Sequence, residues 1–248
     1  MIVYPAIDLR RGRCVRLQQG STDAEIVFAD DPVDAAQRWA AEGTQWLHVV
    51  NLDGALGEGG RENLRALERI LAAVTVPVQF GGGLRSASDA LRLLELGVSR
   101  VVLGTVAVSQ PEVVVETLMR VSPDQVAVGI DARLGRVAIH GWRDVTDMPA
   151  VTLGRRMARL GVERLIYTDV ARDGMLTGVN LEDTRDMARE TGLSIIASGG
   201  VASIEDITAL MAHRNEGIDG VIIGMALYRG TIDLRQALKV AGGAEDAG

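Results

Sequence analysis

Two aspartates stand in matching surroundings near the start and in the middle of this chain. Asp8 lies in the segment Ile-Asp-Leu-Arg-Arg-Gly-Arg, and Asp131 lies 123 residues later in Ile-Asp-Ala-Arg-Leu-Gly-Arg. Two carboxyl groups can divide acid and base work when their surroundings separate their pKa values. Each aspartate can also serve only as a turn residue ahead of Gly12 or Gly135. Recurrence of the pattern favours the catalytic interpretation.

Four glycine-rich segments recur as two matching pairs. Gly81-Gly82-Gly83 matches Ser198-Gly199-Gly200, 117 residues later, and Gly104-Thr105 matches Gly224-Met225-Ala226, 120 residues after it. Glycine lets the backbone approach an anion closely, and a following helix N-terminus adds a favourable dipole. A single segment of this kind can be a simple turn. Two matching pairs predict two phosphate sites that hold an elongated ligand over the aspartates.

The elements that carry these residues follow a repeated strand-helix pattern, with short apolar runs between stretches of helical period. The predicted strands are Ile2 to Ile7, Trp46 to Leu52, Val76 to Phe80, Arg100 to Leu103, Gln125 to Ile130, Arg164 to Asp169, Ser194 to Ala197 and Gly220 to Ile223. Asp31-Pro32 predicts a helix start. Helix ends are predicted at Gly43, Gly97, Gly161 and Gly192.

Eight such strands in a chain of 248 residues predict one α/β domain, a single (β/α)8 or TIM barrel with a twofold repeat. The predicted half-barrels cover about 1–123 and 124–241, and residues 242–248 are expected to form a frayed tail. An open doubly wound sheet is the other fold considered. It does not account for two related halves with four strands each.

The barrel fixes where these residues meet. Active groups in this fold lie at the carboxyl ends of the strands and in the loops that follow. Asp8, Asp131, Thr168 and the glycine segments all fall there. Strands 1 and 5 lie opposite one another in a ring of eight, so we expect Asp8 and Asp131 to face each other across the mouth.

Composition excludes several classes of partner. The net charge is −7 with acids and bases interspersed, which argues against nucleic acid. No apolar run approaches the roughly 20 residues that span a bilayer, and no signal peptide is recognised, so neither a membrane nor export is expected. Cys14 is the lone cysteine, which fits a reducing compartment and predicts a cytoplasmic protein. His48, His140 and His213 lack metal-ligand spacing, so no metal is expected.

With these motifs in order, the chain resembles the family of phosphoribosylformimino-5-aminoimidazole carboxamide ribotide isomerases (ProFAR isomerases), the aldose-ketose isomerases of histidine biosynthesis. The resemblance covers essentially the full length. It rests on Pro5-Ala6-Ile7-Asp8-Leu9, residues 15–20, Asn51-Leu52-Asp53-Gly54-Ala55, residues 80–85, Val128-Gly129-Ile130-Asp131, Gly141-Trp142, residues 168–174, residues 197–201 and residues 224–228.

The resemblance implies an Amadori rearrangement of a substrate with a ribose phosphate at each end, without metal or redox cofactor. It makes Asp8 the general base and Asp131 the general acid. Thr168 and Asp173 would assist ring opening, and Asp173 is a rival for the acid role. The predicted substrate-binding residues are Arg16, Gly82, Gly83, Arg85, Gly104, Thr105, Trp142, Gly178, Ser198, Gly199, Gly200, Gly224 and Met225.

Some of these residues have simpler interpretations. Arg16 would organise Asp8 or the substrate, or be a solvated charge on a strand. Trp142 would cover the ligand, or pack its own loop. Thr168 can be an ordinary strand residue. Segments 20–28 and 141–150 are candidates for closing over the substrate.

Three other functions were weighed. The sister cyclase, imidazole glycerol phosphate synthase, shares the barrel and both aspartates, but that family carries lysine where this chain has Arg16. A dual-substrate isomerase that also accepts phosphoribosyl anthranilate would use the same chemistry. A non-catalytic phosphoribosyl-binding module would not need both aspartates. The sequence leaves the oligomeric state open and is compatible with a monomer.

Overall fold

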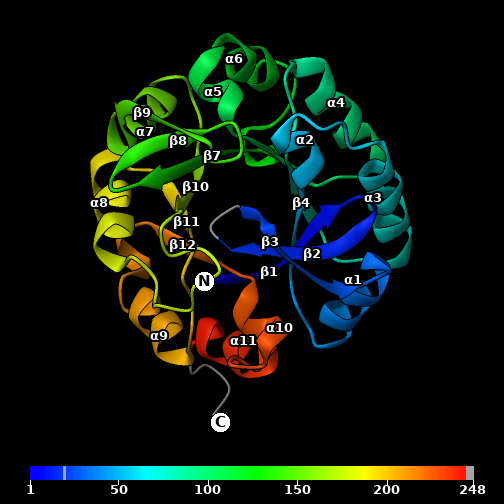
Figure 1. The fold of residues 1–248 in the computed structure, drawn as a ribbon. Helices are drawn as coiled ribbons and strands as arrows, with labels where there is room; N and C mark the ends of the chain where they lie inside the picture. The colour runs from blue at the N-terminus through cyan, green and yellow to red at the C-terminus, as the bar shows by residue number, and fades with distance from the viewer. Residues whose placement is uncertain (19–20, 244–248) are drawn as a thin grey trace.

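The computed structural model describes residues 1–18 and 21–243. Eight of its strands pair in parallel and close into a ring, and the helices form a layer around it (Figure 1). In ring order the strands are β1 (Ile2–Arg10), β4 (Leu47–Asn51), β5 (Val78–Gly81), β6 (Arg100–Leu103), β7 (Val126–Arg133), β10 (Arg164–Asp169), β11 (Ser194–Ser198) and β12 (Ile218–Ile223). Pairing of β10 with β7 and of β12 with β1 completes the ring. The predicted (β/α)8 barrel is confirmed.

The helices follow the predicted alternation. They are α1 (Pro32–Ala41), α2 (Leu52–Leu56), α3 (Arg61–Ala73), α4 (Ala87–Leu96), α5 (Thr105–Ser109), α6 (Glu112–Leu118), α7 (Ala150–Arg159), α8 (Leu181–Thr191), α9 (Ile204–Ala212), α10 (Met225–Arg229) and α11 (Leu234–Gly242), with single 3-10 turns at Pro123–Gln125 and Arg214–Glu216. The longest of these described helices has 13 residues, and none of them is long and apolar enough to cross a bilayer.

Helix ends lie where the sequence predicts them. The Asp31 side chain accepts a hydrogen bond from the Val33 amide at the start of α1. Gly97 and Gly192 end α4 and α8 in the left-handed conformation, which glycine adopts without a Cβ penalty. Gly43 and Gly161 follow α1 and α7 with φ of 96° and 90°.

Two antiparallel hairpins were not predicted, and they lengthen β1 and β7 beyond their predicted ends. β2 (Arg13–Gln18) pairs with β1 and with β3 (Ser21–Ala29), while β8 (Arg136–Ile139) pairs with β7 and with β9 (Asp144–Pro149). Both hairpins turn through two residues of positive φ, at Arg11-Gly12 and at Leu134-Gly135, as a two-residue primed turn requires. The sequence lacks the Asn-Gly or Asp-Gly signal of that turn.

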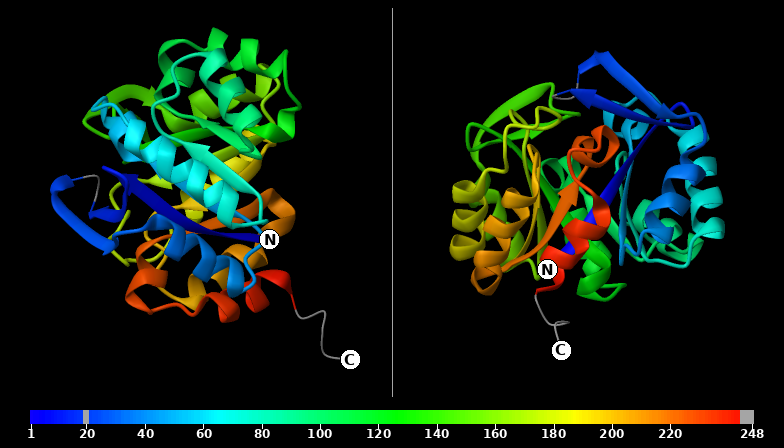
Figure 2. Two further views of the ribbon diagram at one scale, coloured as in Figure 1. Left: turned by 90° about the vertical axis from the view of Figure 1, so that its right-hand side faces the viewer. Right: turned by 90° about the horizontal axis from the view of Figure 1, so that it is seen from below.

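Both predicted closing segments contain strands. β3 begins at Ser21, with Gly20 outside the described residues, and β9 occupies residues 144–149. Figure 2 shows the β2 and β3 hairpin standing out from the end of the barrel opposite the N-terminus. At the other terminus α11 includes Gly242, so the predicted frayed tail overlaps a helix end, and residues 244–248 lie outside the described part.

The core has two layers that place the aspartates. One apolar cluster fills the space between sheet and helices, and a smaller one fills the ring. The ring cluster consists of Tyr4, Ala6, Val102, Ala127, Ile166, Ile196 and Ile222. Because side chains alternate between the faces of a strand, Asp8 continues the inward series of Tyr4 and Ala6, and Asp131 continues that of Ala127. Both aspartates therefore stand on an apolar floor at the barrel mouth.

Candidate active site

The Asp8 carboxylate forms an ion pair with Arg16. The β1 and β2 register places Asp8 opposite Val15, next to Arg16. Arg16 Nη1 donates to Asp8 Oδ2 at 2.6 Å, and Nη2 donates to the Ala6 carbonyl at 2.6 Å. The side chain of Asp8 is 16% exposed and that of Arg16 is 10% exposed. Burial raises the pKa of Asp8, and the charge and hydrogen bond of Arg16 oppose that rise. The interpretation of Arg16 as a solvated charge is wrong.

Arg16 is itself held by residues from the other end of the chain. Its guanidinium lies 5.1 Å from the centre of the Tyr228 ring, and the Tyr228 hydroxyl donates to the Ala6 carbonyl at 3.0 Å. A Cβ at Gly224 would lie 2.7 Å from Arg16 Cζ. Glycine therefore suits position 224, because the Arg16 guanidinium fills the space that a Cβ would occupy.

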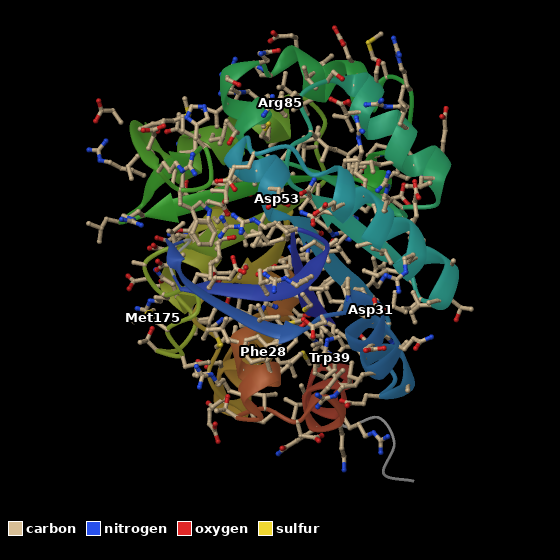
Figure 3. The ribbon with its side chains drawn as sticks, turned by 45° about the vertical axis from the view of Figure 1, so that its right-hand side comes forward. Phe28, Asp31, Trp39, Asp53, Arg85 and Met175 are labelled. Atoms are coloured by element: carbon tan, nitrogen blue, oxygen red, sulfur yellow. The ribbon has the colours of Figure 1, made fainter. Side chains whose placement is uncertain are left out.

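The Tyr228 ring is fixed by two further aromatic contacts. The Phe28 ring of β3 lies 4.8 Å from it, and the Trp39 ring of α1 meets it edge-on at 5.6 Å. Figure 3 shows Phe28 and Trp39 side by side near α10. The β2 and β3 hairpin is thus anchored to the last part of the barrel. The sequence offered no separate signal for Tyr228 beyond its place in a family segment.

The second aspartate has uncharged partners. Asp131 on β7 is in register with Thr168 on β10. Burial raises the pKa of Asp131, and the neighbouring side chains of Trp142 and Thr168 oppose the rise by favouring the charged form of the carboxyl group. Thr168 and Trp142 therefore both contact the predicted site, Trp142 from the loop between β8 and β9.

Asp173, in the loop after β10, lies in the field of both other aspartates. Burial raises the pKa of Asp173 to about 7, the negative charges of Asp8 and Asp131 add to the rise, and Arg16 opposes it. A carboxyl group with such a pKa is protonated in roughly half of the molecules at neutral pH. One mouth thus contains an ionised carboxylate paired with arginine and a carboxyl that can donate a proton.

The paired glycines are required by backbone packing. Gly82 and Gly199 have φ of 100° and 88°. A Cβ would lie 2.2 Å from the Asn51 carbonyl oxygen at Gly82 and 2.5 Å from the Asp169 carbonyl oxygen at Gly199. At Gly200 it would lie 2.4 Å from the Gly178 oxygen, and the Gly178 amide donates to the Gly200 carbonyl. Glycine loops in both halves rest on the loop before them.

Short helices α5 and α10 begin in the same way. Their N-caps, Gly104 and Gly224, have ψ of −110° and −98°. Among the described residues no side chain caps either helix, whereas α4 and α9 have capping boxes. Uncapped helix amides attract anions. The Met225 side chain is buried, so only its backbone can face a ligand, while Thr105 Oγ1 accepts from the His140 amide.

The remaining predicted residues have the following places. Ser198 ends β11 in register with Thr168. Gly83 packs on Gly54, where a Cβ would lie 2.7 Å from its Cα. Arg85 is exposed beside α2 (Figure 3). Within the described residues, no group of three or more histidine, cysteine or acidic side chains is arranged to hold a metal.

The chain matches a family model described as histidine biosynthesis protein over residues 2–233. It is 51% identical over 241 residues to a Moorella thermoacetica protein, covering 97% of this chain and 98% of the relative. That protein is named 1-(5-phosphoribosyl)-5-((5-phosphoribosylamino)methylideneamino)imidazole-4-carboxamide isomerase. Proteins of the same name from Pelotomaculum thermopropionicum and Syntrophotalea carbinolica are each 49% identical, over 99% and 98% of this chain and 94% and 99% of the relatives.

Gly82→Ala should destabilise the protein more than Gly97→Ala. Both positions have positive φ, but a Cβ at Gly97 meets nothing within 4 Å. We expect a loss of about 1 kcal/mol in the free energy of unfolding at Gly97, and about 1–3 kcal/mol more at Gly82 from overpacking. Urea unfolding measures both. Equal losses would show that contact with Asn51 does not constrain position 82.

Proposed function

Because this chain belongs to the family of histidine biosynthesis proteins, we propose that its barrel mouth binds a substrate with a phosphoribosyl group at each end and isomerises one of the riboses. The reaction is the aldose-ketose isomerisation of the pathway, as the isomerase names of its relatives imply. The observation that carries the mechanism is the buried ion pair of Asp8 with Arg16 at the mouth, on the strand that lies across the ring from that of Asp131.

The rearrangement needs one proton donor and one proton acceptor. Protonation of the furanose ring oxygen lets the bond between C1 and that oxygen break, and the nitrogen on C1 supplies electrons to form an iminium. Removal of the C2 proton gives an enolamine, which tautomerises to the ketose. One proton is gained at oxygen and one is lost at carbon, so the reaction changes neither composition nor oxidation state overall.

Asp8 is the proposed acceptor of the C2 proton. The ion pair with Arg16 favours the charged carboxylate despite its burial, and an ionised carboxylate is what a general base requires. The Ala6 carbonyl and the Tyr228 ring hold the guanidinium, so the base is oriented before substrate arrives. This prearrangement reduces the entropy lost on reaching the transition state.

For the donor, electrostatics favour Asp173 over Asp131. A pKa of about 7 keeps Asp173 partly protonated at neutral pH. The neighbouring side chains of Trp142 and Thr168 favour the charged form of Asp131. In this assignment Asp131 raises the pKa of the donor by its charge and positions the sugar, and Thr168 orients Asp131.

The two phosphate groups are assigned to the two glycine regions. The first comprises Gly82, Gly83, Gly104 and Thr105, with Arg85 at its rim, and the second comprises Ser198, Gly199, Gly200, Gly224 and Met225, supported by Gly178. The assignment is supported by the similar backbone geometry at the starts of α5 and α10. Trp142 is assigned to cover the ligand between them.

Other functions from the sequence analysis are less well supported. The relatives are named as isomerases, which does not favour the sister cyclase or a non-catalytic module. The lone buried Cys14 fits the proposed cytoplasmic location. Phosphoribosyl anthranilate as a second substrate would require the same proton transfers.

Asp8→Asn should lower kcat by about 10²- to 10⁴-fold, because an amide cannot accept the C2 proton. Substrate affinity, measured by calorimetry, should change little since the amide has nearly the shape of the carboxylate. A variant that folds normally and retains wild-type turnover would exclude Asp8 as the base.

Turnover against pH should distinguish the two candidate acids. We expect activity to fall above about pH 7, as Asp173 loses its proton, and Asp173→Asn to lose about 10²-fold or more in kcat. Asp131→Asn should keep more activity but move the alkaline limb to lower pH, because it removes a negative charge that raises the pKa of Asp173. If Asp131→Asn alone abolishes turnover, Asp131 is the acid.

The purified protein should isomerise the bisphosphorylated imidazole carboxamide ribotide. Its substrate range is measured by assaying phosphoribosyl anthranilate in parallel. We expect turnover with the imidazole ribotide, whose name matches that of the relatives' substrate. A lack of turnover of the imidazole ribotide at every pH tested between 5 and 9 would contradict the proposed function.

A further inference from the structure

Glu58, in the segment between α2 and α3, joins two parts of the mouth. Its Oε2 accepts from Arg10 Nη2 at 3.4 Å, and its Oε1 accepts from Arg143 Nη2 at 3.5 Å. Arg10 ends β1, two residues beyond Asp8 and on the same strand. Arg143 directly follows Trp142, whose side chain contacts Asp131. Glu58 therefore connects the strand of the proposed base with the loop over Asp131.

The loop that carries Trp142 has a backbone conformation that needs support. His140, Gly141 and Trp142 have φ of 55°, 65° and 69°. Left-handed residues with side chains, here His140 and Trp142, persist only where their surroundings hold them. On one side the His140 amide donates to Thr105 Oγ1 at 3.1 Å. The other side rests on the segment that carries Glu58.

Contacts on that second side are close. A Cβ at Gly141 would lie 2.8 Å from Leu56 Cδ2. Arg143 Nη1 donates to the Leu56 carbonyl at 3.4 Å, next to its ion pair with Glu58. Leu56 and Glu58 thus hold the loop by packing and by charge. Of the two, only Glu58 reaches across to Arg10.

Arg10 extends this link to the hairpin. Its Nη1 donates to Glu25 Oε2 on β3 at 2.8 Å, and its side chain is 6% exposed. Glu25, Arg10, Glu58 and Arg143 form a row of alternating charges, which we name the charge row. One end lies on the hairpin that carries Arg16, and the other lies beside Trp142.

We propose that Glu58 is a positioning residue of the isomerisation: through the charge row it keeps Trp142 on Asp131 while Arg16 is held on Asp8. This inference rests on the proposed function, because it gives Trp142 and Asp131 a part in the reaction. The Glu58 side chain is 39% exposed and exposed ion pairs add little to fold stability, so its effect should be local to the mouth.

The test places 5-fluorotryptophan in the full-length protein and follows the fluorine spectrum and kinetics. The chain has three tryptophans, and Trp142→Phe identifies the Trp142 resonance. Glu58→Gln should shift or broaden that resonance, leave those of Trp39 and Trp46 unchanged, and lower kcat/KM by about two- to fivefold, the range of one exposed ion pair. Thermal unfolding should be nearly unchanged.

Glu216→Gln is the matched control. Glu216 accepts from Arg185 Nε at 3.0 Å and is 41% exposed, but it lies in the 3-10 turn that precedes β12, away from the mouth. We expect wild-type spectra and kinetics from it. Arg143→Gln should reproduce the effect of Glu58→Gln, and the double variant should not add to it, as for two residues of one contact.

The difference in kcat/KM between wild type and Glu58→Gln should also shrink in 1 M salt, where the Debye length is about 3 Å. An unchanged Trp142 resonance with unchanged kcat/KM, or effects of the two single variants that add fully, would overturn the proposal. Wild-type turnover in Trp142→Phe would instead contradict the proposed role of Trp142. The fluorine spectra of Glu58→Gln would still show whether the charge row positions the Trp142 side chain.

Discussion

The Asp8 charge is buried, and much of the structure around the mouth serves to compensate for that burial. A carboxylate taken out of water costs several kcal/mol unless an opposite charge and hydrogen bonds compensate. Arg16 supplies that charge, but it reaches Asp8 only because β2 folds back along β1. The guanidinium then needs the Ala6 carbonyl, the Tyr228 ring and a residue without a side chain at Gly224. The unpredicted hairpin therefore supplies the partner of Asp8 in the candidate active site.

The two halves hold their glycine loops by the same means. In the first half, Asn63 Nδ2 donates to Asn51 Oδ1 and Asp53 Oδ2, and Gly82 packs on the Asn51 backbone. In the second, Asn180 Nδ2 donates to the carboxylates of Asp169 and Asp183, and Gly199 packs on the Asp169 backbone. An asparagine that bridges two side chains, next to a glycine packed on the preceding loop, therefore occurs once in each half. The boundary of the half-barrels near residue 123 stays a prediction.

Sequence patterns predicted what depends on local periodicity and on repetition. The barrel strands are buried apolar runs, and Asp8 and Asp131 recur in matching segments, so both could be found without coordinates. Contacts between distant segments could not. Nothing around Arg11 or Leu134 signals a primed turn, and no spacing rule links Arg16 to Tyr228. The glycines were correctly singled out, but their packing against Asn51 and Asp169 depends on which loops become neighbours.

The proposed chemistry of the mouth depends on asymmetry between the two halves rather than on their symmetry. Two equal aspartates on equivalent strands would have equal pKa values and could not divide the proton transfers. Arg16 breaks the equality at Asp8, whereas the side chains that favour the charged form of Asp131 are the neutral Trp142 and Thr168. Asp173 breaks it again. It stands four residues beyond the end of β10, where the equivalent position beyond β4 is Ala55.

A carboxyl added in one half alone enters a region that already holds two acidic groups and one arginine. Each ionised neighbour makes ionisation of the added carboxyl harder, and burial has the largest effect of this kind. The simplest way to relieve the repulsion is for the added group to keep its proton. A fourth carboxyl at position 55 would complete the symmetry and share that proton between equivalent sites. The alanine there leaves a single residue, Asp173, as the preferred holder of that proton, which in the proposed mechanism opens the ring.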